Sequence, residues 1–394
     1  MMCVAGVVAT LFIALAQVPR ARGEGFEWLP SRPFIEGEQT FKDKGCAGCH
    51  GVLGKAAGPG SDLARGGAGR DVMQLASSFW NHAPIMSRMM MNEQGSKPAT
   101  LSPDEAGKLA GYLFELNFLD RPGDVERGRV VFERRSCVRC HQLGGSGGAA
   151  GPRLDELRPY ATALFLAQAL WSHGPQMVAK MNELGIERRQ LEPDDVDHLL
   201  AFLRGKAVPS QSLDQVAAQT GSPRVGKAVF ASKGCGRCHA LGGVGGGVGP
   251  DLGKRRPEWR LAAVVAALWN HGPTMWEQMR ALGMTVPQVT DREMADLLAY
   301  LYFVQYANID GDAAKGAAVF RGKSCASCHA GERASGPTLT ESEATRSPLH
   351  WASAMWNHAP AVAEEFRARG LAWPRIEDDE MRDLVAFLRA RGTP

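Results

Sequence analysis

The stretch GRVVFERRSCVRCH, residues 128–141, carries the pattern that organises the whole chain. A glycine is followed by a phenylalanine, and the phenylalanine leads into a Cys-x-x-Cys-His motif. The same order occurs four times in the 394 residues. The motifs are Cys46-Ala-Gly-Cys49-His50, Cys137-Val-Arg-Cys140-His141, Cys235-Gly-Arg-Cys238-His239 and Cys325-Ala-Ser-Cys328-His329. Repetition at this long period indicates small domains rather than the units of a solenoid.

Each copy continues with the same landmarks. A glycine-rich loop ends in Gly-Pro, and an apolar run then ends in Trp-[Asn/Ser]-His-[Ala/Gly]-Pro. The copy closes with a segment that has acidic residues at its start and apolar residues at helical spacing, as in EPDDVDHLLAFLRG. Strand-like alternation is missing from the sequence, so we expect an all-α fold. The proline after each Trp-x-His motif is typical of the first turn of a helix.

The landmarks divide the chain into four modules. Module one spans residues 24–121, module two 122–206, module three 223–307 and module four 308–394. Residues 207–222 form a linker, and the stretch Gly205–Ser222 is rich in Ser, Gln, Val and Ala, which favours a hinge. Cutting this stretch is therefore expected to release two soluble halves of two modules each.

Residues 1–23 begin with the apolar run MMCVAGVVATLFIALAQ and resemble a secretory signal peptide. The run is shorter than the about 20 residues that a membrane-spanning helix needs. Because no Lys or Arg precedes it, an uncleaved N-terminal anchor is the alternative. We expect a periplasmic or otherwise extracytoplasmic protein, with membrane contact only if this segment stays uncleaved.

Composition narrows the function. The net charge is +3, with 45 basic and 42 acidic residues and no long run of one sign, so nucleic acid is not an expected partner. Eight of the nine cysteines fall into Cys-x-x-Cys-His motifs, which are typical of covalent c-type haem attachment rather than of a disulfide framework. A zinc site would need further ligand pairs at zinc spacing.

The motifs therefore predict four covalently bound c-type haems. Two cysteines form thioether bonds to the porphyrin, and the adjacent histidine ligates the iron. The predicted attachment residues are Cys46, Cys49, Cys137, Cys140, Cys235, Cys238, Cys325 and Cys328. The predicted proximal iron ligands are His50, His141, His239 and His329.

The order of Gly-x-x-x-Phe, Cys-x-x-Cys-His, Gly-Pro and a closing helix resembles a class I c-type cytochrome domain, four times in tandem. The resemblance implies that the first helix crosses the last, where a glycine meets an aromatic residue. The matching aromatics are Tyr112, Phe202, Tyr300 and Phe387. It also implies that the proline carbonyl of Gly-Pro accepts a hydrogen bond from the proximal histidine. These prolines are Pro59, Pro152, Pro250 and Pro337.

The sixth iron ligand remains open in the sequence. Class I cytochromes usually supply a late methionine, and only Met284 of module three takes such a position. What recurs instead is His-x-x-x-Met-x-x-x-Met, whose steps of four lie on one helical face. The copies are His82/Met86/Met90, His173/Met177/Met181 and His271/Met275/Met279, and module four has His358/Val362/Phe366.

Three hypotheses follow. In the favoured one, His82, His173, His271 and His358 ligate iron, because only the histidine occurs in all four copies and methionine stripes are usually core. In the second, Met86, Met177 and Met275, or the methionines four residues later, ligate iron, and module four is open or different. In the third, the histidine hydrogen-bonds a haem propionate. The modules could also differ from one another.

The four tryptophans of the Trp-x-His motifs have two candidate roles. Each indole N–H needs a partner if it is buried, and a haem propionate would serve. Plain core packing is the other role. The tryptophans are Trp80, Trp171, Trp269 and Trp356.

The leading hypothesis for function is an electron relay between an unidentified redox donor and an acceptor. Axial ligands, burial and hydrogen bonds would tune each potential, and bis-histidine ligation would lower it relative to His–Met ligation. The alternative is a haem enzyme or a gas sensor with one five-coordinate haem, most simply in module four. A subunit docked to a larger respiratory complex is a third option.

Overall fold

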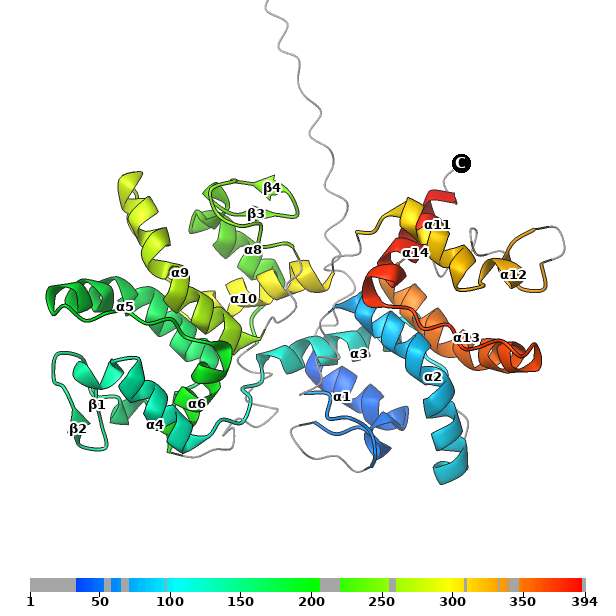
Figure 1. Ribbon diagram of the computed structural model, residues 1–394, viewed down its shortest axis with the longest axis horizontal. Helices are drawn as coiled ribbons and strands as arrows, with labels where there is room; N and C mark the ends of the chain where they lie inside the picture. Colours follow the sequence, from blue (N-terminus) through cyan, green and yellow to red (C-terminus); the bar gives the residue numbers. More distant parts are fainter. Residues whose placement is uncertain are drawn as a thin grey trace, which may run out of the picture.

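The computed structural model describes residues 33–52, 58–64, 71–95, 98–205, 220–254, 260–307, 310–331, 334–337, 339 and 347–391. The predicted signal peptide and residues 207–219 of the predicted linker lie outside this set. The described residues are mainly helical, which confirms the all-α prediction (Figure 1). None of the helices among them is long and apolar enough to cross a membrane.

Every module is built from the same helices. The first helices are α1 Pro33–Asp43, α4 Val125–Arg134, α8 Pro223–Ser232 and α11 Ala313–Gly322. Short turns bearing the cysteines follow at η2 Cys46–Gly48, η4 Cys137–Arg139, η6 Cys235–Arg237 and α12 Ala326–His329. The long middle helices are α2 Val72–Gln94, α5 Ala163–Glu183, α9 Leu261–Ala281 and α13 Pro348–Ala368. The last helices are α3 Pro103–Glu115, α6 Pro193–Arg204, α10 Asp291–Tyr306 and α14 Asp378–Arg391, and the short turns η3 Leu116–Phe118 and η5 Asp155–Leu157 complete the set.

Two antiparallel hairpins interrupt the helical pattern. Strands β1 Gln142–Leu143 and β2 Ser146–Gly147 pair in module two, and β3 Ala240–Leu241 and β4 Val244–Gly245 pair in module three. Both are built from the glycine-rich loops, which we did not expect to form strands. Paired glycines with positive φ, such as Gly144 at 63° and Gly145 at 83°, supply the tight turn that such hairpins require.

The proline of each Trp-x-His-[Ala/Gly]-Pro motif lies inside the middle helix, so the predicted helix start there is wrong. A proline inside a helix has no N–H and leaves the carbonyl four residues earlier without its helical partner. Pro273 frees the carbonyl of Trp269 in this way. Arg188 of module two donates to that carbonyl at 2.7 Å. The proline thus makes a bonding point for another module.

The first and last helices of each module cross at a glycine, as the resemblance implied. A Cβ on Gly316 of α11 would lie 2.7 Å from the Cβ of Phe387 and would overlap the backbone carbonyl of Asp383 in α14. Only a residue without a side chain allows this approach. The predicted aromatics then pack on the phenylalanine of the first helix. The pairs are Phe41–Tyr112, Phe132–Phe202, Phe230–Tyr300 and Phe320–Phe387, with ring centroids 5.4–6.0 Å apart.

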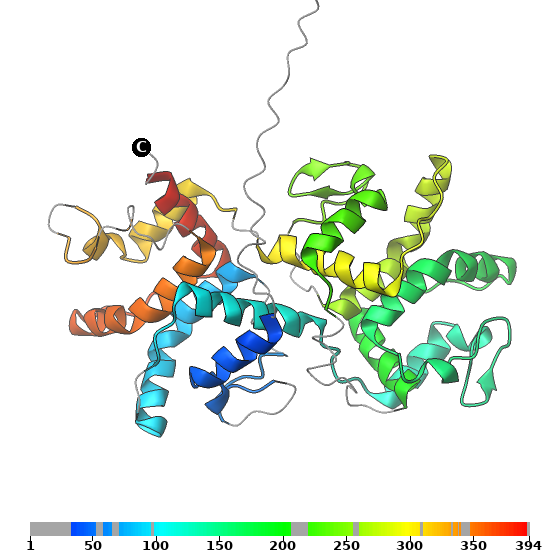
Figure 2. The same cartoon turned by 180° about the vertical axis from the view of Figure 1, so that it is seen from behind.

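The modules associate in two lobes that do not follow chain order (Figure 1). Helix α2 of module one packs against α13 of module four, and α5 of module two packs against α9 of module three. Figure 2 shows the same two lobes from behind. Small residues let the middle helices approach. At Gly174 a Cβ would overlap the indole of Trp276 in the paired module, and the corresponding Ala359 of module four is fully buried.

The Trp-Asn part of the recurring motif joins the paired modules. The Nε1 atoms of Trp80, Trp171, Trp269 and Trp356 donate to the carbonyls of Pro374, Pro287, Arg189 and Ala99, each in the paired module. The asparagine beside the tryptophan makes two bonds in the same way. Asn81 donates to the carbonyl of Ile376 at 2.8 Å and accepts from its N–H at 2.9 Å. The tryptophan N–H groups therefore have protein partners, and the propionate role suggested from the sequence is wrong.

Charged pairs reinforce both lobes. Arg382 of module four bonds to Asp71 of module one at 2.6 Å, and both side chains are almost fully buried. Arg260 of module three bonds to Asp197 of module two. Removing the arginine from such a pair would leave a buried carboxylate without its counter-charge, which costs about 3–5 kcal/mol.

The lobes meet where α3 and α10 approach each other. The Tyr306 hydroxyl donates to the carbonyl of Ala110 at 2.9 Å. Phe114 packs on Tyr306 and Phe118 on Tyr302, with centroids 5.4 and 5.1 Å apart. Because modules one and two belong to different lobes, as do modules three and four, a cut in Gly205–Ser222 would split both lobes. This pairing argues against the expected release of two independent halves, because both lobes would have to come apart.

We predict that a buried carboxyl beside this junction makes stability depend on pH. Glu115, the last residue of α3, is 5% exposed, and its Oε2 has no hydrogen-bond partner among the described residues. Burial raises its pKa from the usual 4.5 to about 8. Between those values the unfolded chain loses a proton that the folded chain keeps, so stability falls as pH rises, by up to about 1.4 kcal/mol per pH unit.

Replacing Glu115 by glutamine should remove this slope, and chemical unfolding at several pH values between 4.5 and 8 would measure it. The matched control is Glu364→Gln, which changes an exposed carboxyl. An unchanged slope in Glu115→Gln, or an equal change in the control, would contradict the assignment.

Candidate haem sites

The cysteines of each motif lie on a tight turn that directs them to one side. In module two the turn is entered through Ser136, whose φ of 65° is left-handed, and it closes when the His141 N–H donates to the Cys137 carbonyl at 2.9 Å. The eight motif cysteines form no disulfide. Burial raises the pKa of the Cys46, Cys137 and Cys325 thiols to about 11. The sulfurs therefore lie, as neutral thiols, against the apolar wall where thioether attachment would occur.

The histidine of each motif is oriented by a backbone carbonyl. Nδ1 of His141, His239 and His329 lies 2.8–3.0 Å from the carbonyl oxygens of Pro152, Pro250 and Pro337, respectively. Such a bond fixes the ring and leaves Nε2 free to bind iron. Three of the four bonds implied by the resemblance are thereby confirmed.

Module one differs. Nδ1 of His50 lies 3.1 Å from the carbonyl of Ser61, so the expected bond to Pro59 is wrong. The reason is the register of the loop. Gly60 donates to the Cys49 carbonyl and packs on the His50 ring, as Gly151 does on His141. The Gly58-Pro59 pair lies two residues earlier in the loop, so the structural counterpart of Gly-Pro is Gly60-Ser61.

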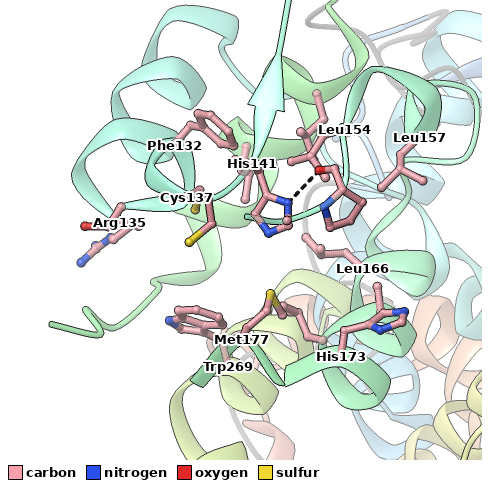
Figure 3. Close-up of a pocket in the computed structure, with 18 of the residues that line it drawn as sticks. Phe132, Arg135, Cys137, His141, Leu154, Leu157, Leu166, His173, Met177 and Trp269 are labelled. Atoms are coloured by element: carbon pink, nitrogen blue, oxygen red, sulfur yellow. Dashed lines mark hydrogen bonds between the residues drawn. The ribbon is translucent and has the colours of Figure 1, made fainter. Parts of the chain in front are cut away.

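A cavity of about 350 Å³ opens beside His141 (Figure 3). Its volume is within the range of small-molecule and cofactor pockets. The walls are mostly apolar and come from the motif turn, α5 and α6, while Trp269 reaches in from module three. An apolar pocket with two cysteines and a histidine at its edge suits a large, flat hydrophobic ring with a metal at its centre. These residues fit haem.

On the wall opposite His141, methionine and histidine take different positions. Met177 lies below the His141 ring, whereas the His173 ring turns to the side (Figure 3). His173 is exposed, and so are His82 and His271. Nδ1 of His82 lies 2.9 Å from the carbonyl of Ser78 on its own helix. By contrast, Met86, Met177 and Met275 are half-buried and pack against the core.

Module four has the opposite arrangement. His358 is half-buried, and its ring centroid lies 6.0 Å from that of His329. Burial, and secondarily the neighbouring His329, lowers the pKa of His358. Val362 occupies the position of the first methionine and packs against the core. Of the four predicted pairs of motif and Trp-x-His histidines, only this one shows a ring contact in the described part of the chain.

Two further predicted methionine positions have different surroundings. Met181 is buried at the wall of the module-two pocket, and Phe366, which occupies its place in module four, is buried too. Met90 and Met279 are half-buried. Met284 lies against the motif turn, with its methyl 3.9 Å from where a Cβ on Gly234 would be.

Turns that present two cysteines and an axial histidine to an apolar pocket define a c-type haem protein. The family description Cytochrome c matches residues 34–117, 125–206, 224–304 and 313–391, one match in each module. The chain belongs to the cytochrome c family, which confirms the resemblance, and it is a haem electron-transfer protein.

Among curated proteins, the chain is similar to cytochrome c oxidase subunit 2 of Alkalihalophilus pseudofirmus. The two are 32% identical over 90 residues, which is 21% of this chain and 26% of that subunit. The similarity thus spans about a quarter of that relative's length.

Proposed function

We propose that the chain is an extracytoplasmic tetrahaem electron carrier that passes electrons between two redox proteins. The observation that carries this is the fourfold repetition of one site in modules that pack against one another in pairs. When bound, each haem iron supplies one-electron exchange between its ferric and ferrous states. The predicted N-terminal signal supports the location.

Within each site, different groups of residues have different roles. The cysteines would hold the porphyrin by thioether bonds, and His50, His141, His239 and His329 would ligate the iron. The loop carbonyls orient these imidazoles, and such bonds also raise the basicity of the ligand. Apolar side chains of the first, middle and last helices exclude water. A dry, rigid site undergoes little reorganisation when the charge on the iron changes.

The pairing of modules supports a relay within each lobe. Trp269 of module three lines the pocket of module two, so that side chain would lie against the haem of the neighbouring module. Modules one and four are joined by the same tryptophan and asparagine bonds. Electrons would therefore exchange first between modules two and three and between modules one and four, and then across the α3–α10 junction.

We predict four haems and four electrons per chain. The pyridine haemochrome assay would give the haem count, and a reductive titration with dithionite would give the electrons. The double variant Cys325→Ala/Cys328→Ala should keep three haems and three electrons.

After a substoichiometric pulse of reductant, electrons should equilibrate within a lobe before they cross between lobes. Fewer than four electrons in the loaded protein, or redistribution in chain order, would contradict the proposal.

The enzyme or sensor alternative is tested on the same protein. A five-coordinate haem binds carbon monoxide when reduced, whereas a six-coordinate carrier does not. Binding by the unmodified chain at one haem would favour that alternative over a pure relay.

A further inference from the structure

We infer that the modules differ in their distal iron ligand: Met86, Met177 and Met275 ligate iron in modules one to three, and His358 does so in module four. The inference rests on the proposed function in that each module must hold a haem. It departs from uniform bis-histidine ligation, the hypothesis that the sequence favoured.

In module two the geometry favours the methionine. The His141 ring and Met177 face each other across the pocket, so a metal held between them could be ligated by both (Figure 3). His173 turns its ring to the side of the pocket and is exposed. Thioether sulfur is a soft ligand, and His–Met pairs ligate the haem iron of many cytochromes.

In module four the geometry favours the histidine. A metal between two imidazoles, each bound through a nitrogen at about 2.1 Å, would hold the ring centroids roughly 6.5 Å apart. The His329 and His358 centroids lie 6.0 Å apart. Val362 has neither a lone pair nor the length to ligate iron. His358 is thus the side chain that faces His329.

The residue four positions after the histidine accounts for the difference. These two positions lie on one face of the middle helix and compete for the same space over the haem. A long methionine fills that space in modules one to three, and the histidine remains outside, as His82 does against the Ser78 carbonyl. Valine is short, so in module four the imidazole can enter.

The proposed axial ligands predict the order of the haem reduction potentials. Methionine stabilises ferrous iron and raises the potential relative to a second imidazole. The haem of module four would then have the lowest potential, and its paired module one would be the first acceptor of its electron. Electrons would enter through module four and leave through a His–Met module.

Near-infrared magnetic circular dichroism of the oxidised, fully loaded protein tests the inference, because the energy of the charge-transfer band identifies the axial pair. We expect three His–Met haems and one bis-histidine haem. Four bis-histidine haems would overturn the inference, and so would a high-spin haem in the unmodified protein.

Matched variants locate the ligands. His358→Ala should open one haem, so that carbon monoxide binding rises from none to one per chain, whereas His173→Ala should open none. Val362→Met should restore a sulfur ligand in the His358→Ala background, giving four His–Met haems and no carbon monoxide binding. Opening by His173→Ala, or no opening by His358→Ala at full haem content, would overturn the assignment.

Module three needs its own comparison because Met284 also lies near the motif turn. Met275→Leu should open one haem and Met284→Leu none, and the reverse would overturn the assignment of Met275. All these spectra are recorded at equilibrium and require no electron exchange between haems. A chain with the expected ligands but no redistribution of electrons would therefore refute the relay and leave the ligands in place.

Discussion

Gly316→Ala is expected to disrupt module four, whereas Gly322→Ala, in the same helix, is expected to leave it intact. The Cβ added at Gly316 would overlap the Asp383 carbonyl and approach the Cβ of Phe387 to 2.7 Å. Backbone cannot yield as a flexible side chain does, so α11 and α14 would have to separate. We expect destabilisation of at least about 3 kcal/mol, the upper end of typical overpacking.

Gly322 is a close control because a Cβ there meets nothing within 4 Å. Alanine is favoured over glycine in helices by up to about 1 kcal/mol, so this variant should be neutral or slightly more stable. Hydrogen exchange of the α11 and α14 amides would measure the local effect, which a single melting temperature of a multidomain chain would not define. Equal protection in both variants would show that the crossing tolerates a side chain.

The second large effect concerns a cut between modules two and three. A protease site placed within residues 206–219 should yield two fragments that stay together under native conditions. Each fragment contributes one module to each lobe, so both lobes span the cut. Asn270 bonds to Leu191 twice, at 2.9 Å each, in one lobe, and Asp71 bonds to Arg382 in the other.

Size-exclusion chromatography with light scattering would give the mass of the nicked protein, and the same sample in urea would show two fragments. We expect the intact mass in buffer. Asp71→Leu removes one of the two carboxylates that pair with Arg382, the other being that of Asp379, and should lower the urea concentration at which the fragments separate. Two masses from the nicked parent protein in buffer would contradict the observed pairing.

Local features could be predicted from the sequence because the residues themselves carry them. Each Cys-x-x-Cys-His motif forms its turn through neighbouring bonds, such as His141 to Cys137. The family resemblance, to which the Gly-x-x-x-Phe pattern contributes, implied the helix crossing and its aromatic partners, including Tyr112 and Phe387.

The association of modules could not be predicted in the same way. The tryptophans bond to backbone carbonyls, such as that of Arg189, and any residue can supply a carbonyl. The partner of His50 was mispredicted for a related reason. The carbonyl of Ser61 can accept the hydrogen bond of the imidazole as well as a proline carbonyl can.

The sequence did contain information about the distal iron ligand. The same histidine occurs in all four modules, which favoured one role for it. Val362 broke the methionine pattern in module four, and that exception indicated that the histidines need not point the same way.

The pairing of modules also determines the order in which the two lobes can form. The pairing is nested, because modules two and three are neighbours in the chain while modules one and four enclose them. Because the chain is synthesised from its N-terminus, modules two and three can pair before module four is complete. Module one must wait with Asp71 and Trp80 uncovered until the last residues arrive. The outer lobe is therefore the last to form, and a truncated chain would expose it first.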